Sequence, residues 1–358
     1  MHDMILEQPG ALHSTLELCR KEASDITSYW EGSTQFILTG CGTSFHAALA
    51  GSYMLYALFQ RTNSEAVQSF ELARYFRRLN PRTVVTAFSH TGNTKTTIDA
   101  VKMAREAGAA TLALTGTSGS NISKEAQRTL VVGNGKEKSR AHTKSYTSSL
   151  LASMYLSSDF VARLASNSLA ESYLEQLNDV PQYVHEAIAK EKEVAHLATN
   201  YHKDIKRYFF IGAGPNVATA LEAALKMKES NYSSAEGMEL EQFLHGPWVS
   251  LDPQNSLVFL IAPKGPSHDR YLDLLGACKE IGVRTVALTD DKHIVDLCTH
   301  SIFMPEITEE LSPLTYVVPL QLFSYYVSVQ KGINPDFIHY QDPRFWSARS
   351  IVFPPGTH

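Results

Sequence analysis

The sequence has few cysteines and none of the patterns in which cysteine builds metal sites or disulfide frameworks. The four that occur, Cys19, Cys41, Cys278 and Cys298, are dispersed, and no Cys-x-x-Cys pair is present. Structural zinc and disulfide bonds are therefore not expected. No apolar run is long enough to span a bilayer, and the N-terminus lacks the basic and apolar blocks of a signal peptide. These absences predict a cytoplasmic protein without a membrane partner.

The chain also lacks an excess of basic residues. Its formal net charge is −5, with 19% charged and 44% hydrophobic residues among 358. This balance gives no electrostatic reason to bind nucleic acid, and it is typical of globular proteins. The length fits two domains of ordinary size. Because no cluster of metal-ligating residues is apparent, we expect neither a metal nor a redox cofactor.

What the sequence does contain is a repeated glycine pattern. The segment 36–44 is an apolar run that ends in Gly-Cys-Gly-Thr-Ser. The segment 209–216 repeats this pattern and ends in Gly-Ala-Gly-Pro-Asn, and the first glycines of the two copies are 172 residues apart. Glycines at such turns let the backbone bend sharply and approach an anion, to which a following helix offers free N–H groups. Two copies indicate a duplicated domain that binds a sugar phosphate or a nucleotide.

The duplication extends beyond the glycine loops. Residues 108–115 match residues 282–289, and each half carries a further buried strand, at 84–88 and 257–261. A short strand closes each half, at 130–132 and 302–304. Short β-branched strands that alternate with helices favour a parallel sheet covered on both faces. The predicted fold class is α/β, with a flavodoxin-like three-layer αβα sandwich in each half.

Composition divides the chain into five predicted segments. They are a helical arm (1–32), a first α/β domain (33–166), a helical connector (167–204), a second α/β domain (205–336) and a tail (337–358). Prolines and aromatic residues in the tail favour an irregular segment that packs on the surface or covers the site.

The segment 89–97 places five hydroxyls and one glycine where a strand becomes a helix. An ordinary helix N-cap needs only one such residue. Several short hydroxyls beside a helix N-terminus can instead bind phosphate oxygens, because ligands of parallel sheets bind beyond the carboxyl ends of the strands. Thr43 and Ser44 follow the neighbouring strand, which favours the phosphate interpretation.

These motifs resemble a known family. Residues 40–44, 89–94 and 143–147 resemble the SIS (sugar isomerase) phosphosugar domain, and the resemblance runs from about residue 30 to 340. Within that family the chain is similar to the isomerase half of glucosamine-6-phosphate synthase and to its deaminating relatives. The longest matching segments lie in the second half, at 220–229, 235–236 and 245–247.

The resemblance implies that the first half holds the phosphate of a small-molecule sugar phosphate. Position 90, commonly glutamine in the synthases, is a histidine that could still donate a hydrogen bond, and position 91 keeps a hydroxyl. Arg140 is either a cation near the site or a solvated loop arginine. The implied phosphate ligands are Ser44, Ser89, His90, Thr91 and Thr94, and we add Thr43, which precedes Ser44.

Glu222, Lys226 and Glu229 are spaced i, i+4, i+7, so they share one helix face. The resemblance implies that Glu229 moves a proton between C1 and C2 of the sugar. It also implies that His245 opens the sugar ring and comes from the other subunit of a homodimer. Lys226 either contacts a sugar oxygen or pairs with its two glutamates.

Two differences from the synthases shape the expected reaction. The synthases carry an N-terminal glutaminase domain with a nucleophilic cysteine, whereas this sequence begins Met1-His2-Asp3. Their tail lysine is also missing: the last lysine is Lys331, and the tail offers Arg344 and Arg349. We therefore expect a deaminase that converts glucosamine 6-phosphate and water to fructose 6-phosphate and ammonia. The alternatives are an isomerase or deglycase for another amino-sugar or fructosamine phosphate, and a non-catalytic sensor, which should lack the Glu229/His245 pair.

Overall fold

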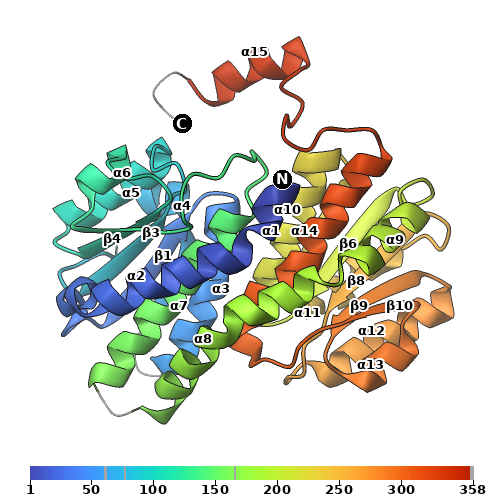
Figure 1. Ribbon diagram of the computed structural model, residues 1–358, viewed down its shortest axis with the longest axis horizontal. Coiled ribbons are helices and arrows are strands. Elements are labelled where there is room, and N and C mark those ends of the chain that lie inside the picture. Colours follow the sequence, from blue (N-terminus) through green and yellow to red (C-terminus); the bar gives the residue numbers. More distant parts are fainter. Residues whose placement is uncertain (60–62, 76–77, 165–166, 355–358) are drawn as a thin grey trace. The chain divides into compact units, whose positions relative to one another are not determined.

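The computed structural model describes residues 1–59, 63–75, 78–164 and 167–354, in which helices and strands alternate (Figure 1). Residues 60–62, 76–77 and 165–166 of the predicted first domain, and residues 355–358 of the predicted tail, lie outside the described part. The chain forms two compact units. The first-half unit comprises residues 7–138, 142–181 and 339–358, and the second-half unit comprises residues 1–6, 139–141 and 182–338.

The first-half unit contains a sheet of five parallel strands in the order β2-β1-β3-β4-β5. This order is that of a flavodoxin-like sandwich. The strands are β1 (Gln35–Gly40), β2 (Asn63–Gln68), β3 (Thr83–Phe88), β4 (Ala110–Thr115) and β5 (Arg128–Val131).

The second-half unit repeats this topology with the order β10-β9-β8-β6-β7, again all parallel. The strands are β6 (Arg207–Gly212), β7 (Ser234–Glu239), β8 (Ser256–Ile261), β9 (Arg284–Thr289) and β10 (His300–Phe303). The identical order confirms the predicted duplication and the three-layer fold of each half.

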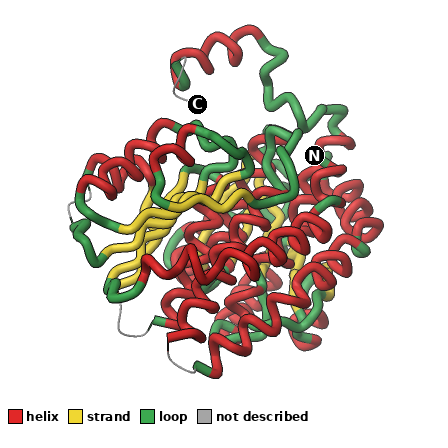
Figure 2. The backbone as a smooth tube through the Cα atoms, turned by 60° about the vertical axis from the view of Figure 1, so that its left-hand side comes forward, coloured by secondary structure: helices red, strands yellow, loops and turns green. Residues whose placement is uncertain are grey.

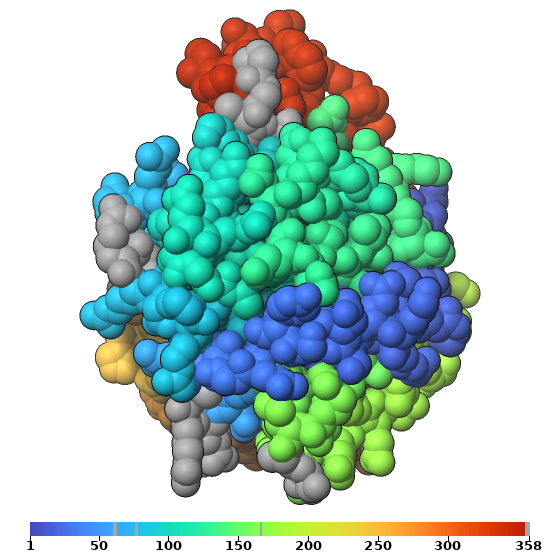
Figure 3. Space-filling view, turned by 90° about the vertical axis from the view of Figure 1, so that its left-hand side faces the viewer, coloured from blue at the N-terminus to red at the C-terminus, as the bar shows by residue number. Residues whose placement is uncertain are grey.

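Helices cover both faces of the first sheet, as the layers of red and yellow in Figure 2 show. One face packs against α3 (Thr43–Leu58) and α7 (Lys144–Leu164), and α2 (Gln8–Thr27) lies on α7. In Figure 3, α2 is a blue band along the surface of this unit. The other face buries Ile37 and Val85 against short helices. These are α4 (Ser69–Arg74), α5 (Lys95–Glu106) and α6 (Asn121–Glu125).

The second sheet is covered in the same way. Phe209 and Ile211 of β6 point to one face, into the core cluster formed with α11 (Leu240–Leu244), α12 (His268–Ile281) and α13 (Lys292–Leu297). Tyr208 points to the other face, where its ring meets Phe323 at 6.0 Å. That face packs against α10 (Asn216–Asn231) and α14 (Pro313–Gln330), with α9 (Glu191–Tyr201) outside α14.

The remaining helices belong to the predicted arm, connector and loops. In the arm, α1 (His2–Leu6) clusters with the second-half unit, whereas α2 and η1 (Ser28–Trp30) belong to the first. The connector consists of α8 (Ser168–Ile188) and α9, and the division between the units falls within α8. Two short helices of the second half are η2 (Pro247–Ser250) and η3 (Glu309–Leu311).

The tail differs from the irregular segment that we expected, because it contains helix α15 (Pro343–Val352). Asp342 caps this helix by accepting a hydrogen bond from the backbone N–H of Arg344 at 2.9 Å, and proline is favourable at a first helical position. The large side chains Phe345 and Trp346 are 46% and 52% exposed. Within the described residues, no helix is both long and apolar enough to cross a membrane.

Candidate functional site

The hydroxyl-rich loops of the first half leave the sheet side by side. Strands β1 and β3 are neighbours, with Thr39 opposite Ala87, so their carboxyl ends lie at the same edge. The Sγ atom of Cys41 lies 3.3 Å from Oγ1 of Thr96, which joins the glycine loop to the start of α5. The structure therefore brings Ser44 and the loop 89–94 to one end of one sheet, as the sequence predicted.

Three of the predicted phosphate ligands have hydroxyls without a partner. The Oγ atom of Ser89 is buried and accepts and donates no hydrogen bond among the described residues. The side chains of Ser44 and Thr94 likewise form no bond within that part of the chain, and Thr94 is the N-cap residue of α5. Thr91 Oγ1 only accepts a weak bond from Asn93 N, at 3.3 Å. Buried hydroxyls usually have hydrogen-bond partners, so Ser89 is an exception, whereas Ser44 and Thr94 are partly exposed.

His90 contacts the 137 loop through one of its ring nitrogens, and its expected contact with phosphate stays a prediction. The ring is buried, and its Nε2 atom accepts a hydrogen bond from the backbone N–H of Glu137 at 3.2 Å. Burial, and then the neighbouring His142, lower the pKa of His90 to about 4. The ring is therefore neutral, and its Nε2 atom is already engaged in holding the 137 loop.

Sequence reasoning missed Glu137, whose buried carboxylate organises the start of α7. It accepts bonds from the backbone N–H of Thr143 at 2.6 Å and of Ser145 at 2.9 Å. The hydroxyls of the same two residues donate to it at 2.8 and 2.6 Å. Burial by itself would raise the pKa of Glu137, but His142 and these hydrogen bonds outweigh it and lower the pKa. The one available signal was an acidic residue upstream of a helix start.

The remaining two first-half predictions have different outcomes. Thr43 is the first residue of α3, directly beside Ser44, and is partly exposed. Arg140 is exposed and clusters with the second-half unit, not with the hydroxyl loops. The structure therefore supports a position for Thr43 in the loop cluster, while the assignment of Arg140 remains a prediction.

In the second half, α10 carries a buried charge cluster. Lys226 is fully buried, and its Nζ atom lies 2.6 Å from Oε2 of Glu229 and 3.2 Å from Oε1 of Glu222. Glu222 is buried as well, whereas the Glu229 side chain is 29% exposed. Burial favours the neutral amine, but the two carboxylates outweigh it and raise the pKa of Lys226 above its ordinary value. Lys226 is thus a permanent cation, and Glu229 is the accessible member.

His245 follows the short helix α11 in the same unit. Its Nδ1 atom lies 2.9 Å from the carbonyl oxygen of Glu241, and its side chain is 73% exposed. A carbonyl only accepts, so Nδ1 carries a hydrogen, and it also lies 3.4 Å from Oε2 of Glu241. No hydrogen bond or ion pair joins His245 to Glu229 in the described part of the chain.

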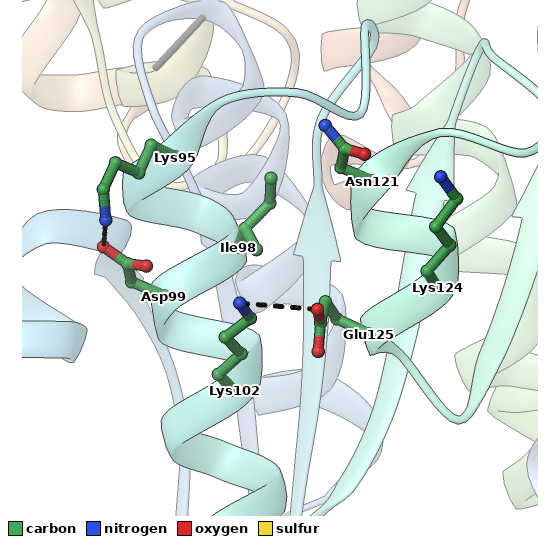
Figure 4. A pocket seen from close by; sticks show the side chains of 7 residues that line it. All are labelled: Lys95, Ile98, Asp99, Lys102, Asn121, Lys124 and Glu125. Carbon is green, nitrogen blue, oxygen red and sulfur yellow. Dashed lines mark hydrogen bonds and ion pairs between the residues drawn. The ribbon is translucent and has the colours of Figure 1, made fainter. Parts of the chain in front are cut away.

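A pocket of about 300 Å³ lies between α5 and α6, beside the hydroxyl loops but without any of their hydroxyls (Figure 4). Two of its lysines are paired, Lys95 with Asp99 at 2.7 Å and Lys102 with Glu125 at 3.4 Å. Because its charges are largely neutralised, we do not include it in the site. No group of three or more potential metal ligands was found among the residues that the structure describes.

Comparison with known proteins identifies the family. The SIS domain profile matches residues 31–158 and 203–331, which are the two sheets and their helices. The chain belongs to the SIS domain family. It is 35% identical over 345 residues to the isomerizing glutamine–fructose-6-phosphate aminotransferase of Thermococcus kodakarensis, and 32% identical to that of Pyrococcus horikoshii. Each alignment covers 93% of this chain and 55% of the relative, so the chain spans about half their length.

Solved structures show the same fold at lower identity. The C-terminal domain of glucosamine-fructose-6-phosphate aminotransferase from Francisella tularensis superimposes with a TM-score of 0.84 at 20% identity, covering 93% and 96% of the two chains. Glucosamine-6-phosphate deaminase from Thermotoga maritima superimposes with a TM-score of 0.72 at 21% identity, covering 94% and 97%. Both the aminotransferase and the deaminase therefore share this SIS architecture.

The role of Glu137 can be tested through stability. Glu137→Gln replaces an acceptor oxygen by an NH₂ group that faces N–H donors, so we expect the free energy of unfolding to fall by about 3 kcal/mol. Because the folded pKa is lowered, the carboxylate's stabilisation is present at neutral pH and is lost as pH falls through that pKa. The difference in free energy of unfolding between the parent protein and the variant should therefore be smaller at pH 4 than at pH 7. Urea unfolding at pH 7 and pH 4 measures both effects, with exposed Lys136→Gln as control. A variant as stable as the control would contradict this role.

Proposed function

We propose that the SIS segments of this chain isomerise and deaminate an amino-sugar phosphate, most specifically glucosamine 6-phosphate to fructose 6-phosphate and ammonia. The observation that carries the proposal is the Lys226–Glu229 pair, in which a buried permanent cation contacts a partly exposed carboxylate. A carboxylate in a mostly buried helix needs a partner or a task, and Glu229 has surface available for a task.

The phosphate of the substrate is assigned to the first half. Ser44, Ser89 and Thr94 offer hydroxyls without partners in the described chain, and α5 supplies N–H groups at its N-terminus. Hydroxyl donors suit a phosphate dianion because a bond to a charged acceptor is stronger than one to a neutral acceptor. In this assignment His90 positions the 137 loop through Nε2, and a contact of its ring with the phosphate stays a prediction.

The proton transfer is assigned to Glu229. It removes the C2 proton of the open-chain amino aldehyde and returns it to C1. The aldehyde oxygen takes up a proton as the C2 amine gives one up, so C1 becomes an alcohol and C2 an imine. Water then adds to the imine carbon, and ammonia leaves as the C2 ketone forms. Lys226 is assigned the pairing role, because its ammonium lies 2.6 Å from Glu229 and 3.2 Å from Glu222. Its other candidate role, contact with a sugar oxygen, stays a prediction.

Ring opening is assigned to His245. Nδ1 donates to the carbonyl oxygen of Glu241, so the exposed Nε2 atom can accept the proton of the sugar's C1 hydroxyl and return it to the oxygen of the sugar ring. Histidine suits this work because its ordinary pKa lies near neutrality. The 73% exposure of the side chain is what a residue that acts on a partner subunit's substrate would have in a single chain.

A second candidate is the reverse reaction, fructose 6-phosphate plus ammonia giving the amino sugar. It is favoured by the relatives from Thermococcus kodakarensis and Pyrococcus horikoshii, which are aminotransferases. The same residues serve both directions, so the two candidates differ in the source and fate of ammonia. An assay in both directions with residues 1–358 separates them.

Glu229→Gln tests the proton transfer. We expect the parent protein to release ammonia from glucosamine 6-phosphate within a panel of amino-sugar 6-phosphates, and the variant to lose about 10²- to 10⁴-fold in kcat with affinity for fructose 6-phosphate kept. Glu280→Gln changes an exposed carboxylate of the same unit and should have no effect. Unchanged turnover in Glu229→Gln would remove this residue from the mechanism.

The double variant Ser89→Ala/Thr94→Ala tests the phosphate assignment. Hydrogen bonds to a charged group contribute roughly 1.5–3 kcal/mol each, so KM for the sugar phosphate should rise by about a hundredfold or more. Affinity is measured by titration with fructose 6-phosphate, with exposed Ser14→Ala of the same unit as control. An affinity equal to that of the control would place the phosphate elsewhere.

We further propose a homodimer in which His245 completes the site of the partner subunit. Subunits of Glu229→Gln and of His245→Ala are each expected to be inactive. After mixing and subunit exchange, a heterodimer contains one site with both residues intact, so about a quarter of the parent activity should return in a statistical mixture. Native mass spectrometry confirms the exchange. Exchange without recovery would show that His245 acts within its own chain.

The tail is proposed to cover the sugar and to shield the imine from bulk water, as lids commonly do. Its exposed residues Phe345 and Trp346 would be buried by closure, whereas Arg344 pairs with Asp342 at 2.7 Å. Deleting the residues after His339 should therefore lower kcat sharply while the thermal midpoint is kept. Loss of stability in proportion to loss of activity would instead assign the tail a packing role.

A further inference from the structure

The second half contains a counterpart of the phosphate-binding edge. Strands β1, β3 and β4 correspond to β6, β8 and β9, and their positions differ by 172 to 174 residues. The loop 89–94 after β3 therefore corresponds to the loop 262–267 after β8. Gly42 and Gly92, which frame the first-half edge, correspond to Gly214 and Gly265, and all but Gly265 have positive φ values.

The second-half edge is filled by the side chain of Glu309 from η3. A Cβ atom built on Gly265 would lie 2.6 Å from Oε2 of Glu309, and one built on Gly214 would lie 3.5 Å from Oε1. The carboxylate thus lies against both glycine loops, in space that only glycine leaves open at Gly265. The first half differs, because Ser89 Oγ at its own edge is buried without a partner in the described chain.

A second carboxylate accepts a hydrogen bond from a backbone N–H group of the same edge. Asp290 follows β9 and accepts the backbone N–H of Lys264 at 2.7 Å. The corresponding position in the first half, directly after β4, is Gly116. The other carboxylate oxygen of Asp290 is buried near the hydroxyl of Tyr316. Asp290 thus takes one backbone donor of this edge, whereas Glu309 fills the space between the glycine loops.

Glu309 is not held at this position by donors. No hydrogen bond or ion pair to its carboxylate occurs within the described residues. Burial, and then the neighbouring Glu310, raise the pKa of Glu309 to about 7. The position of the Glu309 side chain therefore follows from where η3 places it beside the loops. This position does not require the carboxyl group to be charged.

We propose that the second half retains a latent site for a phosphate monoester or inorganic phosphate, framed by Gly214 and Gly265, and that the Glu309 side chain closes it. Lys264, which now pairs with Glu306 at 2.8 Å, would supply the cation of the opened site. The inference rests on the proposed phosphate site of the first half, with which the edge is compared. Its consequence is that each chain binds one phosphate group rather than two.

The test first weakens the first-half phosphate site and then removes the Glu309 side chain from the second-half edge. In the Ser89→Ala/Thr94→Ala background the first-half site is weakened, and calorimetric titration with inorganic phosphate sets the reference. Adding Glu309→Ala to that background should create one new site per chain, and a crystal soaked in phosphate should show the anion between Gly214 and Gly265. Adding Glu310→Ala instead removes the adjacent carboxyl group and should create no site.

Lys264→Ala provides a second criterion. Introduced together with Glu309→Ala, it should weaken the new site at least tenfold. A folded Glu309→Ala variant that gains no phosphate site, or a new site that is indifferent to Lys264, would overturn the proposal. If the Ser89→Ala/Thr94→Ala background binds phosphate as the parent does, the first-half assignment fails, and the gain caused by Glu309→Ala is still measured against that background.

Discussion

The close approach of backbone to backbone at the end of the first strand of each half is the constraint on which the rest of the structure depends. At Gly40 a Cβ atom would lie 2.6 Å from the carbonyl carbon of Ser44, and at Gly212 it would lie 2.1 Å from the carbonyl oxygen of Asn216. Glycine alone allows the chain to pass from strand to helix so tightly. This turn sets the helix N-terminus at the sheet edge, and the neighbouring loops then gather beside it.

The two halves share this scaffold but differ in the chemistry of the corresponding positions. Helix α3 of the first half buries Ala50 and Met54, where α10 of the second half buries Glu222 and Lys226. The sheet edges differ in the opposite sense, because the first has free hydroxyls and the second has carboxylates. In the proposed mechanism one copy therefore binds an anion and the other copy transfers a proton. Such a division relieves each half of the need to provide both environments.

The sequence predicted the elements whose pattern follows from burial and missed those that depend on tertiary contacts. Central strands such as β3 and β8 are buried on both faces and read as continuous apolar runs. The edge strands β2 and β7 are polar and partly exposed, so they have no such run and were not identified. Glu137 was missed because its function as a helix cap depends on a loop fold that spacing alone does not reveal. In the site, by contrast, helical periodicity was sufficient to place Glu222, Lys226 and Glu229 together.

The buried ammonium of Lys226 explains why α10 needs two carboxylates. A buried charge that loses its partner is strongly destabilising, by about 3–5 kcal/mol. In the proposed reaction Glu229 becomes neutral each time it takes the C2 proton, and at that moment its attraction for Lys226 is lost. Glu222 is fully buried and lies 3.2 Å from the ammonium, so it keeps the cation paired. The inner carboxylate thus lets the outer one change its charge during turnover without leaving a charge unpaired inside the helix layer.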